Sequence, residues 1–253
     1  MENVNDYENR IVVFIDILGF SSIVKSTDNS DVNKREKKQK EAKEGKGILD
    51  NLTDALHFIR VEVEKLKESG SSIKISQFSD SLVISSSDES NEILTIFHFL
   101  KYVQVNLLTV YNILIRGGVV RGKVIHTEHI LVGPAMVDAY NLESKCANSP
   151  RIVVMPSVRN IYDNERKKSG IEKKYSVLKQ DYDGMFYIDY FNNLEPKFVD
   201  SEVEYINKIE NIINMNSKRR DVTIKVKYYW MRSKLEDREK ATKSKILHNS
   251  KVS

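Results

Sequence analysis

An apolar segment near the N-terminus leads directly into a single carboxylate. Residues 11–21 read IVVFIDILGFS, in which Asp16 follows five apolar residues. Such a run is typical of a strand buried in a sheet, and the glycine and serine after it indicate a turn into a short helix. A carboxylate at the tip of a buried strand is costly unless it meets a cation or several hydrogen-bond donors. Asp16 is therefore a candidate metal ligand.

A second segment repeats this arrangement. Residues 73–85 read IKISQFSDSLVIS, a pattern that predicts two strands joined by a tight turn around Asp80. If these strands lie beside the first one, both carboxylates reach the same edge of the sheet. Mg²⁺ and Mn²⁺ that carry nucleotide phosphates are bound by one or two carboxylates together with phosphate oxygens. Asp16 and Asp80 together therefore predict a divalent-metal site.

The hydrophobic pattern predicts an α+β fold. Strands are expected at 10–16, 72–86 (a hairpin), 114–125 and 152–155, with an edge strand at 184–190; helices are expected at 48–68, 93–110, 136–146, 203–215 and 222–241. The first elements follow the order of a ferredoxin-like βαββαβ unit, in which the first strand and the hairpin lie side by side. We expect one catalytic domain over 1–200 and a C-terminal helical extension over 201–253. Residues 27–46 carry almost no apolar side chain and predict a mobile insertion.

Composition narrows the function classes. The 253 residues are 40% hydrophobic, which suffices for a core, and the net charge is a mild +4. No apolar stretch approaches the ~18 residues of a membrane span, and the polar N-terminus does not resemble a signal peptide. The basic stretches 34–46 and 218–251 lack the interleaved aromatic residues of a single-strand binding face, so they predict solvated helices. The single cysteine, Cys146, cannot form an internal disulfide, and no Cys/His cluster suggests zinc, so we expect a cytoplasmic protein. From the charge pattern and the lack of an apolar span we expect neither nucleic-acid nor membrane partners.

The two aspartate segments resemble a known enzyme family. Residues 14–21, FIDILGFS, resemble the first metal-binding segment of class III nucleotidyl cyclases, and residues 78–81, FSDS, are similar to the second, with Ser where the family has Gly. The variant QFSDS looks closer to the Pycsar cyclases, the bacterial pyrimidine cyclases of anti-phage defence. Three later segments agree: RGGVVRGKV at 116–124, GPAMVDAYNLE at 133–143 and KYYW at 227–230. The resemblance covers roughly residues 10–190, with a weaker echo at the C-terminus.

The resemblance implies an activity and its requirements. It implies a class III cyclase catalytic domain that converts a pyrimidine nucleoside triphosphate, UTP ahead of CTP, to a 3′,5′-cyclic nucleotide and pyrophosphate. It implies two Mn²⁺ or Mg²⁺ ions, held by Asp16, Asp80 and the backbone carbonyl of Ile17. Two such ions can activate the attacking oxygen and hold the leaving group. It also implies a homodimer in which each active site is built across the dimer interface.

Further residues are candidates for substrate contacts. Phe14 and the turn Leu18, Gly19 and Phe20 lie next to Asp16, and amides at the start of a helix favour phosphate oxygens. Lys74 and Gln77 lie near the positions at which the purine cyclases read the base, so the resemblance implies that one of them contacts the base. Ordinary alternation on a half-exposed strand is the alternative explanation. Tyr140 and Asn141 would come from the partner protomer.

Two arginines lie on the glycine-rich strand, and a guanidinium there can stabilise charge on a phosphoryl group. Arg121 is the preferred catalytic candidate over Arg116 because it neighbours Gly122 in the middle of the strand. The alternative for both is a surface ion pair.

One departure separates this chain from the purine cyclases. Those enzymes carry an Asn and, four residues later, an Arg on the helix after this strand; aligned through residues 142–144, these places hold Val137 and Asn141. The usual transition-state arginine is absent, which favours the pyrimidine branch. It also leaves open a degenerate cyclase-fold sensor that binds a nucleotide without turning it over. A nucleic-acid binder that uses the basic C-terminal region is a third hypothesis.

Overall fold

The computed structural model describes residues 6–21, 24, 35–196, 199, 201–218 and 220–249, with the backbone alone at 35–46, 48, 90 and 244–249. The first six elements are β1 (Glu8–Ile17), α2 (Arg35–Glu68), β2 (Lys74–Phe78), β3 (Ser81–Ser87), α3 (Ser90–Thr109) and β4 (Ile115–His126). They are followed by β5 (Leu131–Val132), α4 (Pro134–Cys146), β6 (Ile152–Val154), α5 (Pro156–Lys168), a 3₁₀ turn (Lys173–Tyr175), β7 (Leu178–Gln180), β8 (Phe186–Ile188), α6 (Glu202–Ser217) and α7 (Val222–Asn249).

The sheet confirms the predicted ferredoxin-like unit. Its strands lie in the order β2-β3-β1-β4-β6-β8-β7, with β5 paired to β4. The first four strands are thus ordered 2-3-1-4, and β1 runs antiparallel to both neighbours. The order follows the predicted βαββαβ topology, and the chain has an α+β fold. Because β1 is central, the residue at its tip lies between the ends of β3 and β4.

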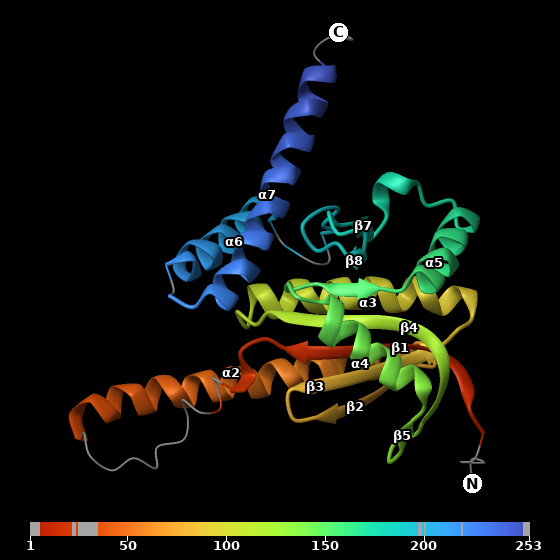
Figure 1. Cartoon of the computed structure of the whole chain (residues 1–253), viewed down its shortest axis with the longest axis horizontal. Coiled ribbons are helices and arrows are strands. Elements are labelled where there is room, and N and C mark those ends of the chain that lie inside the picture. Colours follow the sequence, from red (N-terminus) through yellow and green to blue (C-terminus); the bar gives the residue numbers. More distant parts are fainter. Residues whose placement is uncertain are drawn as a thin grey trace.

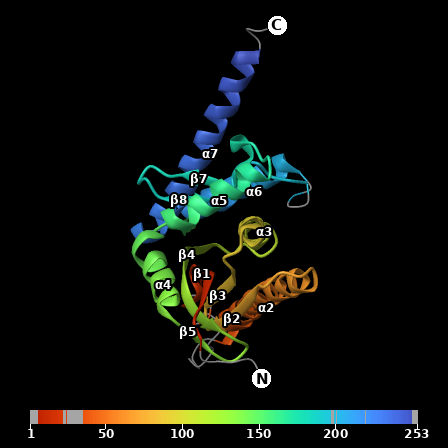
Figure 2. The same cartoon turned by 90° about the vertical axis from the view of Figure 1, so that its right-hand side faces the viewer.

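Helices cover both faces of this sheet. Alternate residues of β1 face opposite sides: Ile11, Val13 and Ile15 pack against α2 and α3, whereas Val12 and Phe14 pack against α4. All five are buried, which explains why β1 reads as a continuous apolar run. Figure 2 shows α2 and α3 on one side of the strands and α4 on the other.

The C-terminal helices form a third packed cluster. Side chains of α6 and α7, including Ile209, Ile213 and Met231, pack with Val105 and Leu108 of α3. The far end of α7 extends away from the rest of the molecule (Figure 1). None of the helices in the described part of the chain combines the length and the apolar character that a membrane crossing requires.

Several elements differ from the sequence predictions. Helix α2 begins at Arg35, inside the segment expected to be a mobile insertion, while 27–34 lie outside the described residues. The expected edge strand, β8, lies inside the sheet, and β7 forms that edge. Neither β7 nor α5 was expected. Strands of three residues are too short for a readable period, and α5 is dominated by charged residues on its exposed side.

A buried polar network around His126 links β2, β3 and β4. His126, at the end of β4, is 3% exposed. Its Nδ1 lies 2.8 Å from Ser85 Oγ and its Nε2 lies 3.0 Å from Ser76 Oγ. Because Arg10 Nε donates to Ser85 Oγ at 2.8 Å, the Ser85 hydroxyl is free to donate to an unprotonated Nδ1. Burial, and then the charge of Arg10, lower the pKa of His126 from 6.5 to about 4.

This histidine should make the fold acid-sensitive. The unfolded chain takes up the proton near pH 6.5, whereas folded His126 resists it down to about pH 4. The free energy of unfolding should therefore fall by up to about 3 kcal/mol as the pH drops through this window. Urea unfolding of His126→Gln should show a flatter pH dependence, while His57→Gln, an exposed change on α2, should follow the wild type. Identical pH slopes for His126→Gln and the wild type would contradict this role.

Candidate functional site

The predicted aspartates meet at one end of the sheet. Asp16 lies opposite Ser81 of β3, and the Ile17 amide donates to the Asp80 carbonyl at 3.2 Å. Both turns depend on left-handed backbone, with φ of 85° at Gly19 and 56° at Ser79. Glycine adopts this conformation without strain, whereas Ser79 does so at some cost. The hairpin turn therefore holds Asp80 beside the tip of β1.

An arginine stands directly across from Asp16. Arg116 is the cross-strand partner of Asp16 on β4, and its Nε donates to Asp16 Oδ2 at 2.9 Å. The same Nε lies 2.6 Å from Glu143 Oε1. Its N–H is directed at Asp16, so Glu143 Oε1 forms an ion pair but has no hydrogen-bond partner among the described residues. One guanidinium is therefore shared by two carboxylates.

Glu143 reaches this position because α4 lies unusually close to β4. A Cβ at Gly118 would stand 2.6 Å from the Ala139 carbonyl oxygen and 2.9 Å from the Glu143 amide nitrogen. Only glycine allows that approach. Glu143 is 2% exposed. Burial raises the pKa of Glu143, the charge of Arg116 opposes this shift, and the carboxylates of Asp16 and Asp80 add to it. The carboxylates of Asp16 and Asp80 thus act on that of Glu143 at the end of the sheet.

These groups fit a hard cation that brings its own oxygens. Asp16, Asp80 and Glu143 supply the carboxylate oxygens that Mg²⁺ or Mn²⁺ prefers, and Glu143 Oε1, although ion-paired with Arg116, accepts no hydrogen bond from a described residue. Among the residues with described side chains, no three His, Cys, Asp or Glu groups are placed to hold an ion by themselves. Phosphate oxygens would supply the remaining ligands, as they commonly do for Mg²⁺.

Some predicted substrate contacts lie close to Asp16. Phe14, two residues before Asp16 on the same face, has its ring 5.4 Å from that of Tyr140, with the planes at 79°. Tyr140 is 49% exposed on α4, next to Asn141. Leu18 and Phe20 follow in the turn, where the Leu18 amide is already bonded to the Leu114 carbonyl at 2.9 Å. The Leu18 amide is therefore engaged within the fold.

The structure places Lys74 and Gln77 away from Asp16. Lys74 shares the Asp16 face, but its row across the sheet runs through Ser85 and Val12, four positions from Asp16 along β1. Gln77 lies in the row of Ile15, on the opposite face, where it accepts from Arg60 Nη2 of α2 at 3.0 Å. Within one chain, neither is brought to the carboxylate cluster.

Arg121 is likewise separated from Asp16. It lies opposite Ile11, on the α2 and α3 face, and its Nε donates to Asp88 Oδ2 at 2.8 Å. The structure thus gives Arg121 the surface ion pair that was the alternative hypothesis, and Arg116 is the arginine beside Asp16. A role for Arg121 in the same site as Asp16 would require a second copy of the chain. Sequence reasoning missed Glu143, although this residue ends the quoted 133–143 segment.

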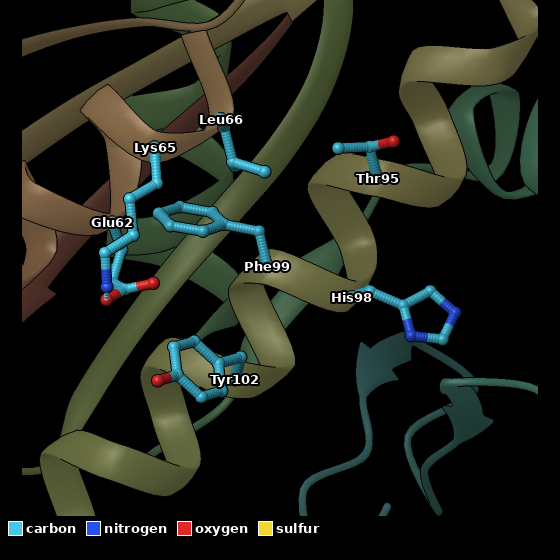
Figure 3. A pocket seen from close by; sticks show the side chains of 7 residues that line it. All are labelled: Glu62, Lys65, Leu66, Thr95, His98, Phe99 and Tyr102. Carbon is cyan, nitrogen blue, oxygen red and sulfur yellow. Dashed lines mark hydrogen bonds and ion pairs between the residues drawn. The ribbon is translucent and has the colours of Figure 1, made fainter. Parts of the chain in front are cut away.

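A separate hollow lies on the other side of the sheet. It encloses about 390 Å³ between α2 and α3 and is lined by Glu62, Lys65, Leu66, Thr95, His98, Phe99 and Tyr102 (Figure 3). Its walls are mainly apolar, with the ion-paired Glu62 and Lys65 at 2.6 Å. The sheet separates it from Asp16, so it is not part of the carboxylate cluster.

Comparisons with known proteins give a likeness of fold. No family model and no curated protein matches the chain. Several solved structures do match the chain. The guanylyl cyclase domain of the RhoGC fusion protein from Blastocladiella emersonii is 15% identical, with a TM-score of 0.48, covering 72% of this chain and 95% of that one. The adenylyl cyclase CyaB from P. aeruginosa is 14% identical, with a TM-score of 0.47, covering 75% and 98%.

A third structure is described differently. A class III adenylyl cyclase-like ATP-binding protein from Pseudomonas aeruginosa is 12% identical, with a TM-score of 0.44, and the match covers 79% of this chain and 40% of that one. These structures are similar to this chain in their fold alone. The ferredoxin-like strand order follows from this chain's own strand pairing, and the arrangement around Arg116 follows from its own hydrogen bonds and ion pairs.

Proposed function

We propose that this chain is a metal-dependent nucleotidyl cyclase that acts on a pyrimidine nucleoside triphosphate, UTP ahead of CTP, as a cytoplasmic homodimer in anti-phage defence. The observation that carries the proposal is the pairing of Arg116 with Asp16 and Glu143 at the end of the sheet, with Asp80 in the adjoining hairpin turn. The carboxylates can bind metal cations, and the Arg116 guanidinium can bind phosphate. The segments that resemble the Pycsar cyclases support the choice of base and biological role.

The reaction needs charge to be stabilised along the triphosphate. The 3′-hydroxyl oxygen attacks the α-phosphorus and loses its proton, a P–O bond forms, and pyrophosphate leaves. Bound at Asp16, Asp80 and the Ile17 carbonyl, divalent cations would neutralise phosphate charge and acidify the attacking hydroxyl. Asp16 fixes Arg116 through Nε, and no hydrogen bond from its terminal nitrogens to a described residue is present. Those nitrogens are free to donate to phosphate oxygens.

A dimer would complete the site. Exposed apolar side chains lie on α4 and β5, with Val137 at 53%, Tyr140 at 49% and Val132 at 50% exposed. Exposed apolar patches are typical of surfaces that bind another protein, and we expect one around these side chains. A partner covering this surface would lie next to Phe14 and Asp16, and could offer its own Tyr140, Asn141, Lys74 or Arg121 to the nucleotide.

Tyr140 should influence the choice of base. Pyrimidines are smaller than purines, so the large, half-exposed side chain of Tyr140, offered by the partner protomer, can exclude ATP and GTP by its bulk. Tyr140→Ala is expected to lower turnover of UTP or CTP by about 10-fold and to raise the share of purine products, because a missing wall is worth about 1–3 kcal/mol. Competition assays with mixed triphosphates measure this. Tyr175→Ala, an exposed change remote from Asp16, is the control. Unchanged rate and base preference in Tyr140→Ala would exclude the role.

The alternative is a nucleotide-binding sensor without turnover. It is favoured by Asn141, which stands where the purine cyclases have their transition-state arginine, and by the hydrogen bond that ties Arg116 to Asp16. Release of pyrophosphate decides between the two. The proposed enzyme releases it from UTP or CTP only when Mn²⁺ or Mg²⁺ is present. Saturable nucleotide binding without any pyrophosphate release would establish the sensor.

A further inference from the structure

One buried arginine bonds both to the end of α4 and to the start of β4. Arg151 lies just before β6 and is 4% exposed. Its backbone carbonyl accepts from the Gly117 amide at 3.1 Å, and its Nη2 donates to the Cys146 carbonyl at 3.0 Å. Gly117 follows Arg116 on β4, and Cys146 is the last residue of α4. A single residue thus contacts both elements that form the Arg116–Glu143 ion pair.

The bond to Cys146 satisfies the end of the helix. The last four carbonyls of a helix have no partner within it, and a cationic side chain there also interacts favourably with the helix dipole. The Glu143 carbonyl accepts from the Ala147 amide at 2.9 Å, whereas the Cys146 carbonyl accepts from Arg151. Cys146 follows Glu143 by about one helical turn. Arg151 therefore fixes the turn of α4 from which the Glu143 side chain reaches Arg116.

Two aspartates fix the guanidinium itself. Arg151 pairs with Asp181 through Nη1 and with Asp183 through Nη2, and both aspartates lie on the turn between β7 and β8. Asp181 is held in turn by α7, where Trp230 Nε1 donates to it at 2.6 Å and Lys234 pairs with it. A guanidinium is a planar fork whose donors point in fixed directions. These ion pairs therefore set the direction of its bond to the end of α4.

The contacts of Arg116 are short enough to depend on where α4 ends. Arg116 Nε lies 2.6 Å from Glu143 Oε1 and 2.9 Å from Asp16 Oδ2. Such contacts weaken steeply when donor and acceptor move apart or lose their alignment. A displacement of about 1 Å can slow an enzyme by about 10²-fold even when its cause lies away from the reacting atoms. The residue that fixes the end of α4 therefore affects the guanidinium that would face phosphate.

We propose that Arg151 is a positioning residue of the carboxylate cluster. It keeps Arg116 and Glu143 in contact by bonding to the strand of the first and to the helix of the second. This deepens the proposed function and rests on it, because Arg116 is the group that binds phosphate there. Arg151 acts only through these two residues. The β7–β8 turn and α7, which hold its guanidinium through Asp181, thereby support the active site.

Arg151→Lys tests this role in the full-length protein. The variant keeps a charge beside Asp181 but lacks the planar fork that reaches two aspartates and the Cys146 carbonyl at once. For UTP or CTP, whichever is the better substrate, kcat/KM should fall by about 10-fold or more. Alkylation of Cys146, the only cysteine of the chain and a partly exposed one, by iodoacetamide should become about 5-fold faster or more. The reason is that the end of α4 loses a charge-assisted hydrogen bond.

Arg166→Lys is the matched change elsewhere in the fold. Arg166 is 5% exposed, pairs with Asp163 and donates through Nη1 to the Ile171 carbonyl, just beyond α5. Its replacement should therefore lower the thermal midpoint about as much as Arg151→Lys does. Both variants are assayed well below their midpoints. Arg166→Lys should keep kcat/KM and the rate of Cys146 alkylation within about 2-fold of the wild type, as expected for an independent site.

The two measurements separate the possible outcomes. Equal kcat/KM in Arg151→Lys and Arg166→Lys would overturn the assignment of Arg151 while leaving the cyclase proposal intact. A slower Arg151→Lys protein whose Cys146 is alkylated at the wild-type rate would also overturn it, because the loss would not pass through the end of α4. Faster alkylation in Arg151→Lys alone, in a protein that forms no cyclic product from any triphosphate, would support the hold of Arg151 on α4 and contradict the cyclase proposal instead.

Discussion

Asp16→Ala and Asp80→Ala proteins should each lose cyclisation by at least about 10²-fold, the scale on which removing one group that stabilises developing charge slows an enzyme. Asp16 holds Arg116 and Asp80 acts on the same Glu143 carboxylate, so either change removes a proposed ligand for the cation that accompanies the triphosphate. Both residues lie at strand ends and contribute little packing. We therefore expect thermal midpoints close to that of the wild type, measured alongside the rate of cyclic nucleotide formation.

A nearby carboxylate serves as the control for these variants. Asp138 is exposed on α4 and carries the same charge, but it lies on the outer side of the helix. Asp138→Ala should cyclise at the wild-type rate. Near-native turnover by a folded Asp16→Ala or Asp80→Ala protein would show that the carboxylate cluster is not the metal site.

Asp181→Ala should destabilise the fold by about 3–5 kcal/mol, the usual cost of removing one partner from a buried ion pair. Arg151 and Lys234, 5% and 2% exposed at their side chains, would be left as buried cations. The hydrogen bonds of Asp181 with Lys234 and Trp230 lower the pKa of Asp181 against the effect of its burial, so the group is charged in the folded protein. Urea unfolding monitored by circular dichroism measures the loss.

Asp183→Ala is the matched change for this network. Asp183 also pairs with Arg151, but its side chain is 47% exposed. Its removal should cost no more than about 1 kcal/mol. If the two variants are equally stable, the Asp181 network does not hold α7 in place.

Local pattern was sufficient to predict the fold and the proximity of the two aspartate-bearing turns. The apolar run before Asp16, the hairpin around Asp80 and the order of the elements together specify a ferredoxin-like sheet with both carboxylates at one edge. The choice between Arg116 and Arg121 depended on register. Positions an odd number apart on a strand face opposite sides, so only the pairing of β4 with β1 decides which arginine lies beside Asp16.

The remaining parts of the site depend on long-range packing. Glu143 reaches Arg116 only because Gly118 lets α4 approach β4 closely. The position of α7 depends on Asp181, Arg151 and Lys234, which come from three separate segments and pair through the Asp181 carboxylate. Such long-range contacts leave no periodic pattern in the local sequence. The early start of α2 at Arg35 is a related case, since the polar composition of that segment favoured a mobile loop over a helix.

The most direct measurement is the identification of the product by mass. Purified full-length protein is incubated with Mn²⁺ and each of ATP, GTP, CTP and UTP, with Asp16→Ala as the control for contaminating activity. We predict cUMP or cCMP, formed together with pyrophosphate and in large excess over cAMP and cGMP. A purine cyclic nucleotide as the main product would contradict the assigned substrate, and no cyclic product from any of the four would contradict the assignment of this chain as a cyclase.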